Sequence, residues 1–379
     1  MKIGIVCYPT FGGSGVVATE LGIGLSEAGH EVHFITYKRP VRLTSFHHNI
    51  IFHEVTSLEY PLFDYAPYES SLASKLVDVI RFEKLDILHV HYAIPHAAVA
   101  YMAKQILKTK GINIPVVTTL HGTDITLVGA DKSFSPVVEF SINQSDGVTA
   151  VSEHLKNETL ENFDIKVPIK VIPNFIDFTR FRKTNKDHFK KALAPDGEKI
   201  LVHISNFRKV KRVEDVVRVF QNVHKKIPGK LLLIGDGPER SHLEELCRQM
   251  HLCDEVRFLG KQEAVDELLA ISDVFLLPSE SESFGLAALE AMACEVPVIS
   301  SNAGGIPEVN IHGVTGYVCE IGDVDAMSSY CVQLLSDENK LKQFRENAYS
   351  QAKKFDIVKL LPEYIQYYEK VIQTVNVYA

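Results

Sequence analysis

The chain has 379 residues, of which 46% are hydrophobic and 23% are charged, and its formal net charge is −8. At roughly 100–200 residues per domain, this length predicts two domains, and the composition is that of a globular protein with sizeable cores. The negative charge argues against a general binder of nucleic acid or of anionic membranes.

The cysteines and the N-terminus favour a cytoplasmic location. Six cysteines are scattered without a Cys-x-x-Cys pair, which indicates reduced thiols and not a disulfide framework or a zinc site. The chain starts directly with an apolar strand and lacks the hydrophobic segment of a signal peptide. No apolar run reaches the ~20 residues that a membrane span needs, so we expect no membrane partner.

Apolar strands alternate with helices along the first half. Strands are predicted at residues 2–7, 31–37, 87–91, 116–120 and 147–151, and the first helix at about 16–28. This β-α-β rhythm is typical of a doubly wound parallel sheet.

The rhythm restarts after a turn-rich stretch at residues 173–177. Strands are predicted at residues 200–204, 230–234, 256–259, 274–277 and 298–300, with a helix at about 213–225. The polar stretch 182–198 is helical in character, and a last helix is expected at 362–379. We therefore predict an α/β protein with two Rossmann-like domains, divided between residues 175 and 176.

The stretch 278–297 carries two carboxylates around a predicted helix start. Glu282 lies in the turn after a buried strand, and Glu290 lies inside the helix that runs from about residue 286 to 294. Backbone N–H groups of Phe284, Gly285 and Leu286 at a helix N-terminus suit a phosphate, and carboxylates suit hydroxyl groups. A capped core helix with acids near its positive end is an equally good interpretation of this spacing.

The first loop is rich in glycine. Gly13-x-Gly15-x-x-Ala18 fits the dinucleotide fingerprint. However, residues 8–11 separate it from the strand, and the second strand ends in Tyr-Lys-Arg without an acid for the ribose. An NADP-dependent enzyme and a purely steric glycine turn remain alternatives, although a loop that faces an inter-domain cleft fits better.

Several histidines follow or lie in predicted strands. His121 follows a strand at the edge where ligands bind in parallel sheets, so it is a candidate partner of a sugar hydroxyl, or alternatively of the local backbone. The spacing of His89, His91 and His96 argues against a metal site. Asp323 precedes helix formers, which favours an N-cap role over a role in binding a divalent ion.

A local basic cluster follows the strand at 200–204. Residues 208–212 hold four cations in five positions, which suits a diphosphate leaving group. A solvated basic turn is the plainer alternative. No Gly-x-Ser-x-Gly elbow or P-loop is present, which weakens hydrolase and ATPase hypotheses.

Together these motifs resemble the retaining glycosyltransferases with the GT-B fold, a family that includes sucrose synthase and bacterial mannosyltransferases. The resemblance rests on the segment with Glu282 and Glu290, the loop 12–15, Lys211, and the glycine turns at 235–239 and 304–308. It implies two Rossmann-like domains with a cleft between them. It also implies that residues 362–379 return to an acceptor-side domain of residues 1–175, while residues 176–361 bind the nucleotide sugar.

The stretches CYPTFGGSGVVATELG, LDILHVHYAIPHA, TTLHGTDIT and HISNFRKVKRVEDVV are similar to the branch of this family in bacillithiol biosynthesis. This similarity implies transfer of N-acetylglucosamine from UDP-N-acetylglucosamine to L-malate with an α product, without cofactor or metal, and it leaves a homo-oligomer open. The alternatives are another sugar-nucleotide transferase, such as a mannosyltransferase acting on a membrane lipid, and a non-catalytic sugar-nucleotide-binding protein.

The resemblance also assigns roles to single residues. It implies that Gly12, Gly13 and Ser14 approach the donor phosphate and the acceptor, and that His121 and Glu282 contact the donor sugar. It implies that the diphosphate is bound by Lys211, by Arg208 and by the backbone amides of Phe284, Gly285 and Leu286. It also implies that Glu290 binds the ribose and that Gly237, Lys261 and Gln262 lie on the nucleotide side. Asn206 replaces the Arg that is usual in the family five residues before the lysine, so it serves either donor or acceptor. Tyr92, Thr119, Asn206 and Arg42 are the predicted partners of the malate carboxylates.

Overall fold

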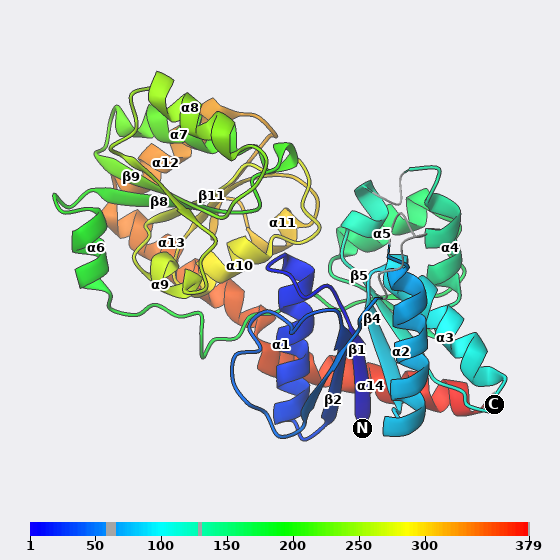
Figure 1. The fold of residues 1–379 in the computed structure, drawn as a ribbon. Coiled ribbons are helices and arrows are strands. Elements are labelled where there is room, and N and C mark those ends of the chain that lie inside the picture. The colour runs from blue at the N-terminus through cyan, green and yellow to red at the C-terminus, as the bar shows by residue number, and fades with distance from the viewer. Residues whose placement is uncertain (58–65, 128–130, 378–379) are drawn as a thin grey trace. The chain divides into compact units, whose positions relative to one another are not determined.

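The computed structural model describes residues 1–57, 66–127 and 131–377, and the chain forms two compact units. Unit 1 comprises Met1–Phe175 and Ile357–Ala379, and unit 2 comprises Ile176–Asp356. Each unit is built around one parallel β-sheet with helices on its faces (Figure 1). The predicted α/β fold with two Rossmann-like domains is therefore confirmed.

Unit 1 contains a seven-stranded parallel sheet in the order β3-β2-β1-β4-β5-β6-β7. Its strands are β1 (Lys2–Val6), β2 (Glu31–Thr36), β3 (Ile50–Glu54), β4 (Ile87–His91), β5 (Val116–Leu120), β6 (Gly147–Ala150) and β7 (Ile169–Val171). Every residue of β4 and β5 is buried, as expected for strands covered on both faces. The sequence did not predict the edge strands β3 and β7, which are short and partly exposed.

Helices cover both faces of this sheet. They are α1 (Gly13–Glu27), α2 (Tyr68–Glu83), α3 (Ala98–Lys108), α4 (Ser135–Asn143), α5 (Glu153–Asn162) and α14 (Ile357–Val377). Helices α2 and α3 pack together over one apolar core, and α1 packs against α14 (Figure 1).

The final helix is anchored to the sheet of unit 1. It begins at Ile357, five residues before the predicted start, so Pro362 lies inside it; the last two residues of the predicted range lie outside the described residues. The Tyr367 hydroxyl accepts a hydrogen bond from Val148 N at 2.9 Å and donates one to Val148 O at 3.1 Å. A Cβ on Gly147 would lie 2.8 Å from Val371, so this glycine permits the close approach.

Unit 2 contains a six-stranded parallel sheet in the order β10-β9-β8-β11-β12-β13. Its strands are β8 (Lys199–Ile204), β9 (Gly229–Ile234), β10 (Val256–Gly260), β11 (Val274–Leu277), β12 (Val298–Ser301) and β13 (Gly316–Cys319). Its helices are α6 (Asp187–Leu193), α7 (Val213–His224), α8 (Arg240–Gln249), α9 (Val265–Ala270), α10 (Leu286–Ala293), α11 (Ile306–Val309), α12 (Val324–Leu335) and α13 (Glu338–Ala352). Five of these strands match the prediction, and the edge strand β13 was missed.

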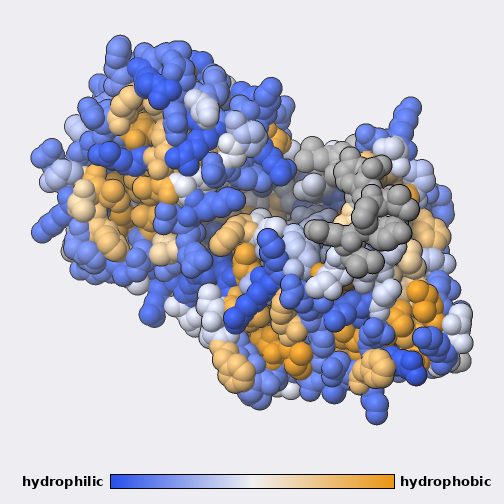
Figure 2. Space-filling view, viewed as in Figure 1, coloured by the Kyte–Doolittle hydropathy of each residue, from blue (hydrophilic) through white to orange (hydrophobic). Residues whose placement is uncertain are grey.

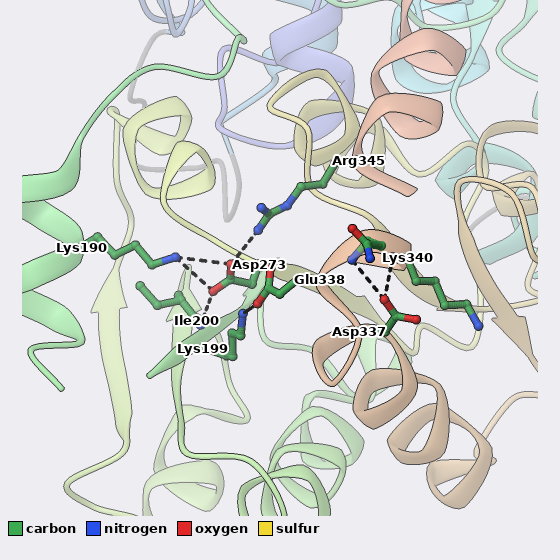
Figure 3. A network of polar contacts seen from close by, with 9 residues as sticks. Lys190, Lys199, Ile200, Asp273, Asp337, Glu338, Lys340 and Arg345 are labelled. Carbon is green, nitrogen blue, oxygen red and sulfur yellow. Dashed lines mark hydrogen bonds and ion pairs between the residues drawn. The ribbon is translucent and has the colours of Figure 1, made fainter. Parts of the chain in front are cut away.

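A buried carboxylate organises the amino-terminal edge of this sheet (Figure 3). Asp273 is 2% exposed and accepts hydrogen bonds from Ile200 N at 2.9 Å and from Arg345 Nη2 at 2.6 Å. Lys190 Nζ lies 3.3 Å from both of its oxygens. Because this carboxylate is paired and hydrogen-bonded, it ties α6 and α13 to the sheet at the edge opposite the ligand-binding loops.

The visible surface of both units is mainly hydrophilic, with several separate hydrophobic patches (Figure 2). Within the described residues, no helix is both long and apolar enough to cross a membrane.

Candidate active site

Each sheet has one point at which its strand order reverses. In unit 2 this point lies between β8 and β11, and in unit 1 it lies between β1 and β4. Loops that leave the carboxyl ends of the two strands diverge there, and ligands of doubly wound folds bind in the resulting crevice. The predicted site residues lie mostly on these loops.

In unit 2, an ion pair joins the two loops at the reversal point. Lys211 follows β8 and Glu282 follows β11, and Lys211 Nζ lies 2.6 Å from Glu282 Oε1. The Ser279 hydroxyl donates to the same carboxylate oxygen at 3.1 Å. The lysine and glutamate side chains are 20% and 16% exposed, so each has solvent-facing surface available for a ligand. Two residues predicted from separate motifs are thus in direct contact.

The start of α10 presents backbone amides close to Glu282. Gly285 precedes the helix with φ +91°, a conformation that favours glycine. The first N–H groups of a helix have no partner within it, so Phe284, Gly285 and Leu286 supply donors here. The Phe284 ring is buried against Phe355, with 5.6 Å between centroids, which fixes this backbone from behind.

Glu290 lies one turn further along α10 and is 5% exposed. The turn at Gly304-Gly305 supports the segment that precedes the helix, because Gly305 N donates to Glu282 O at 2.9 Å. A Cβ on Gly304 would lie 1.9 Å from the same oxygen, so only glycine fits. The backbone around Glu282 is therefore held by close packing.

Glycines also bring the loops after β8 and β9 together. A Cβ on Gly235 would lie 1.8 Å from Ser205 O, and one on Gly237 would lie 2.6 Å from Phe207 O. Phe207 N donates to Asp236 O at 3.1 Å. The remaining predicted donor residues of this edge have exposed side chains, namely Asn206, Arg208, Lys261 and Gln262.

In unit 1, a neutral hydrogen bond joins the loops at the reversal point. The Tyr92 hydroxyl, after β4, donates to Ser14 Oγ at the start of α1 at 2.8 Å. Tyr92 has φ +84°, which is strained for a non-glycine residue and is typical of functional sites. A Cβ on Gly15 would lie 2.4 Å from Tyr8 O, so the loop needs glycine there. Gly12 and Gly13 are exposed before the helix.

His121 lies after β5 and is 8% exposed. Its Nε2 is 2.8 Å from His91 Nδ1, so one of the two rings donates to the other. Burial lowers the pKa of His121 to about 3, and burial also lowers the pKa of His91 well below its usual value. His121 is therefore a neutral hydrogen-bonding group near pH 7.

A buried chain of polar groups lies behind these histidines. His89 bonds to the Tyr368 hydroxyl at 2.7 Å and to Thr119 Oγ1 at 2.7 Å, and Thr119 Oγ1 lies 2.6 Å from Thr149 Oγ1. Thr119 is fully buried, so its hydroxyl serves the interior of the sheet. Its role as an acceptor-binding residue stays a prediction.

The other predicted acceptor residues are spread over the two units. Arg42 lies after β2, where its Nη1 is 3.2 Å from Glu20 Oε1. Tyr92 belongs to the loop after β4, and Asn206 belongs to unit 2.

The predicted N-cap role of Asp323 is confirmed, because its Oδ1 accepts a hydrogen bond from Ala326 N at 2.9 Å.

The sequence interpretation gave no role to Asp124, which organises the loops of unit 1. Its carboxylate accepts hydrogen bonds from Ala93 N at 2.9 Å, Gly122 N at 3.1 Å and His121 N at 3.3 Å. Burial raises its pKa to about 6. The sequence offered one signal for this residue, an acid three residues after His121. The contact with Ala93 N could not be predicted, because Ala93 lies on another loop, after β4.

Comparisons with known proteins identify the class. Residues 11–180 match the family model described as Glycosyltransferase Family 4, and residues 184–351 match Glycosyl transferases group 1. Sucrose-phosphate synthase from Thermosynechococcus elongatus superposes with a TM-score of 0.82 at 21% identity, covering 99% of this chain and 100% of that one. Anabaena HepE in complex with UDP-glucose gives 0.81 at 21% identity, covering all of both chains. The two parallel-sheet units thus have the GT-B fold.

One relative is much more similar in sequence. N-acetyl-alpha-D-glucosaminyl L-malate synthase of Bacillus anthracis is 52% identical over 378 residues, which is 98% of each chain. The chain therefore belongs to the family of GT-B glycosyltransferases that contains this enzyme, and it is a glycosyltransferase. The alternative of an NADP-dependent enzyme is wrong.

Proposed function

We propose that the chain transfers N-acetylglucosamine from UDP-N-acetylglucosamine to L-malate with retention, giving N-acetyl-α-D-glucosaminyl L-malate, the first step of bacillithiol biosynthesis. The observation that carries this proposal is the 52% identity to the Bacillus anthracis synthase over 98% of both chains. Six scattered free cysteines favour the cytoplasm as the place of this reaction.

In this proposal, Lys211 and the amides of α10 stabilise the departing UDP. Negative charge develops on the diphosphate as the glycosidic bond breaks, and a preorganised cation and N–H donors lower the free energy of that state. Lys211 Nζ lies where the loops after β8 and β11 meet, 2.6 Å from Glu282 Oε1. Arg208 is exposed three residues earlier and adds positive charge. These groups provide the charge stabilisation that a metal ion gives in other transferases, so we propose metal-independent transfer.

The two glutamates have separate proposed roles. Glu282 accepts hydrogen bonds from hydroxyls of the transferred sugar, and Glu290 accepts them from the ribose. Gly237, Lys261 and Gln262 flank the nucleotide. The support for this division is that the two carboxylates lie on opposite sides of the amides at the start of α10 along the chain.

Unit 1 contributes neutral donors and one cation in this proposal. Ser14 and the amides of Gly12 and Gly13 contact phosphate and acceptor, and neutral His121 bonds to the sugar. The residues proposed for the malate carboxylates are Tyr92, Arg42 and Asn206. No protein side chain is assigned as a covalent nucleophile, so the acceptor oxygen replaces UDP on the same face of the sugar. The acceptor proton then passes to the leaving phosphate oxygen.

The proposal is tested by measuring UDP release from UDP-N-acetylglucosamine with L-malate, with D-malate, with succinate and without acceptor. We expect release that requires L-malate, an α-linked product by NMR, and the same rate after removal of metal by a chelator. A malate-independent rate, or preference for another sugar nucleotide or a lipid acceptor, contradicts the proposal. Loss of activity with chelator that returns with a divalent ion contradicts metal independence alone.

A further inference from the structure

Two histidines and a glutamate meet in unit 1, away from the ligand-binding loops. His33 belongs to β2, His53 to β3 and Glu83 is the last residue of α2. One ligand atom from each lies within 4.8 Å of the others, and within the described part of the chain this is the one group of three such side chains. The histidines are 20 residues apart on different strands, so no sequence motif predicts that they meet.

The sheet register explains why these side chains share a face. Strand β2 pairs in parallel with β3, with His33 opposite Ile51 and Ile35 opposite His53. Because alternate residues of a strand point the same way, His33 and His53 lie on one face with Ile35. Ile35 packs into the core formed with α2, so the C-terminal end of α2 delivers Glu83 to the same face.

The hydrogen bonds of His33 leave one ring nitrogen with a lone pair. His33 Nε2 lies 2.9 Å from Glu31 Oε1, and Lys2 Nζ lies 2.8 Å from the same carboxylate oxygen. An ionised carboxylate only accepts, so Nε2 carries the proton and Nδ1 is unprotonated in the neutral ring. A carboxylate bonded to the second nitrogen is the usual support of a metal-binding histidine.

The lone pair of His33 Nδ1 points to His53. His33 Nδ1 and His53 Nε2 are 2.9 Å apart, and the two rings are nearly parallel, with 12° between their planes. In a metal-free protein, His53 Nε2–H donates to His33 Nδ1. If the proton of the His53 ring lies instead on its own Nδ1, His53 Nε2 and His33 Nδ1 both present lone pairs to one cation. Glu83 and the negative end of the α2 dipole add attraction for positive charge.

We propose that His33 Nδ1, His53 Nε2 and the Glu83 carboxylate form a binding site for a divalent transition-metal ion of the zinc class, with water as the fourth ligand. Two imidazoles and one carboxylate suit Zn²⁺, whose ligands lie at about 2.0–2.2 Å. The ion joins edge strand β3 and the end of α2 to strand β2. Its role is structural, because Glu31 and Glu83 lie toward the amino-terminal edge of the sheet and the proposed catalytic loops leave the carboxyl edge.

The test uses the full chain without a histidine tag. Cys253 is an exposed thiol, so every protein carries Cys253→Ser to remove a competing ligand. Chelator-treated protein is titrated with Zn²⁺ by calorimetry and with Co²⁺ by visible absorption, and Tm is measured with and without Zn²⁺. We expect one ion per chain, the absorption of four-coordinate Co²⁺, and a higher Tm with Zn²⁺.

Two variants and one control assign the binding to this site. His53→Gln keeps an N–H donor for His33, and Glu83→Gln keeps the side-chain volume; both should bind Zn²⁺ at least about tenfold more weakly and lose the Tm increase. The control is His154→Ala, which removes a histidine lying 3.5 Å from Glu158 on α5 and should bind like the parent. The absence of saturable binding by the parent, or unchanged affinity in both variants, overturns the proposal. Glu83→Gln lies at a helix end, so it keeps the test decisive if His53→Gln folds poorly.

Discussion

At the reversal point of unit 1 the groups that join the loops are neutral, whereas at that of unit 2 they are charged. Tyr92 and Ser14 share a hydroxyl–hydroxyl hydrogen bond backed by buried histidines, while Lys211 and Glu282 form a partly exposed ion pair. Both sheets follow the same topological rule, and the chemistry on their loops differs.

This difference agrees with a division of labour in glycosyl transfer. A diphosphate needs a cation that can leave its protein partner, and the partial exposure of the Lys211–Glu282 pair lets water or a ligand compete for the lysine. At its own reversal point, unit 1 holds uncharged donors in fixed positions, which suits a sugar hydroxyl whose charge changes little.

The largest expected effect concerns acid stability, which should differ between the units. Burial lowers the pKa of His89 to about 3, that of His96 to about 4 and that of His121 to about 3, and it also lowers the pKa of His91 well below its usual value. The unfolded chain therefore binds protons below pH ~6.5 that the folded unit does not, so stability falls as pH falls from 6.5 toward 4. Each such histidine contributes up to about 1.4 kcal/mol per pH unit, so unit 1 should lose several kcal/mol, on the order of 5–10, by pH 5.

Two groups limit this contrast. Asp124 acts in the opposite direction, because its raised pKa of about 6 means that protonation stabilises the fold between pH 6 and 4. Unit 2 has one comparable histidine, His203, whose pKa burial lowers to about 4. Hydrogen exchange measured by mass spectrometry on peptides of each unit at pH 7 and pH 5 checks the prediction. Equal losses of protection in the two units contradict it.

The second effect is catalytic. Lys211→Ala should lower kcat by roughly 10²–10³-fold, because one preorganised partner of the leaving group is lost. The fold should change little, since the side chain is partly exposed. Lys209→Ala, an exposed lysine two residues away, is the matched control and should retain activity. Steady-state kinetics and Tm measure both quantities; wild-type turnover in Lys211→Ala would exclude the leaving-group role.

A smaller effect separates the two glutamates of unit 2. Glu290→Gln should weaken the binding of UDP by roughly 10–100-fold, the range for a hydrogen bond to a charged group. Glu282→Gln should spare UDP and weaken use of the complete donor. Glu280→Gln, an exposed neighbour, is the control. Calorimetric titration with UDP and kinetics with the sugar nucleotide are the measurements, and equal loss of UDP affinity in both variants contradicts the division.

The smallest effect tests the neutral bond of unit 1. Tyr92→Phe removes the hydrogen bond to Ser14 and should reduce kcat/KM by about fivefold, since a neutral hydrogen bond contributes about 1 kcal/mol. Tyr101→Phe on α3 is the control. A loss as large as that of Lys211→Ala would show that unit 1 bears charge in the reaction.

Much of the fold could be predicted because its signals are local. A buried strand such as β11 is a continuous apolar run, and turns such as that at Gly235 need glycine whatever the rest of the chain does. The edge strands β3 and β7 were missed, because partly exposed strands lack that pattern. The edge strand β13 is mostly buried but has only four residues, Gly-Tyr-Val-Cys, which are too few and too mixed to stand out. The burial of Thr119 could not be predicted, because position at a strand end does not say whether a hydroxyl faces ligand or core.

The sequence by itself determined the α/β class, the glycine-rich loops, the basic cluster at 208–212 and the family. The tertiary structure decided which of these meet. Lys211 contacts Glu282 across 71 residues of chain, because strand order places β8 beside β11. His33 meets His53 because parallel register puts both on one face. Strand order and register depend on how the whole sheet is assembled, and no local stretch of sequence encodes them.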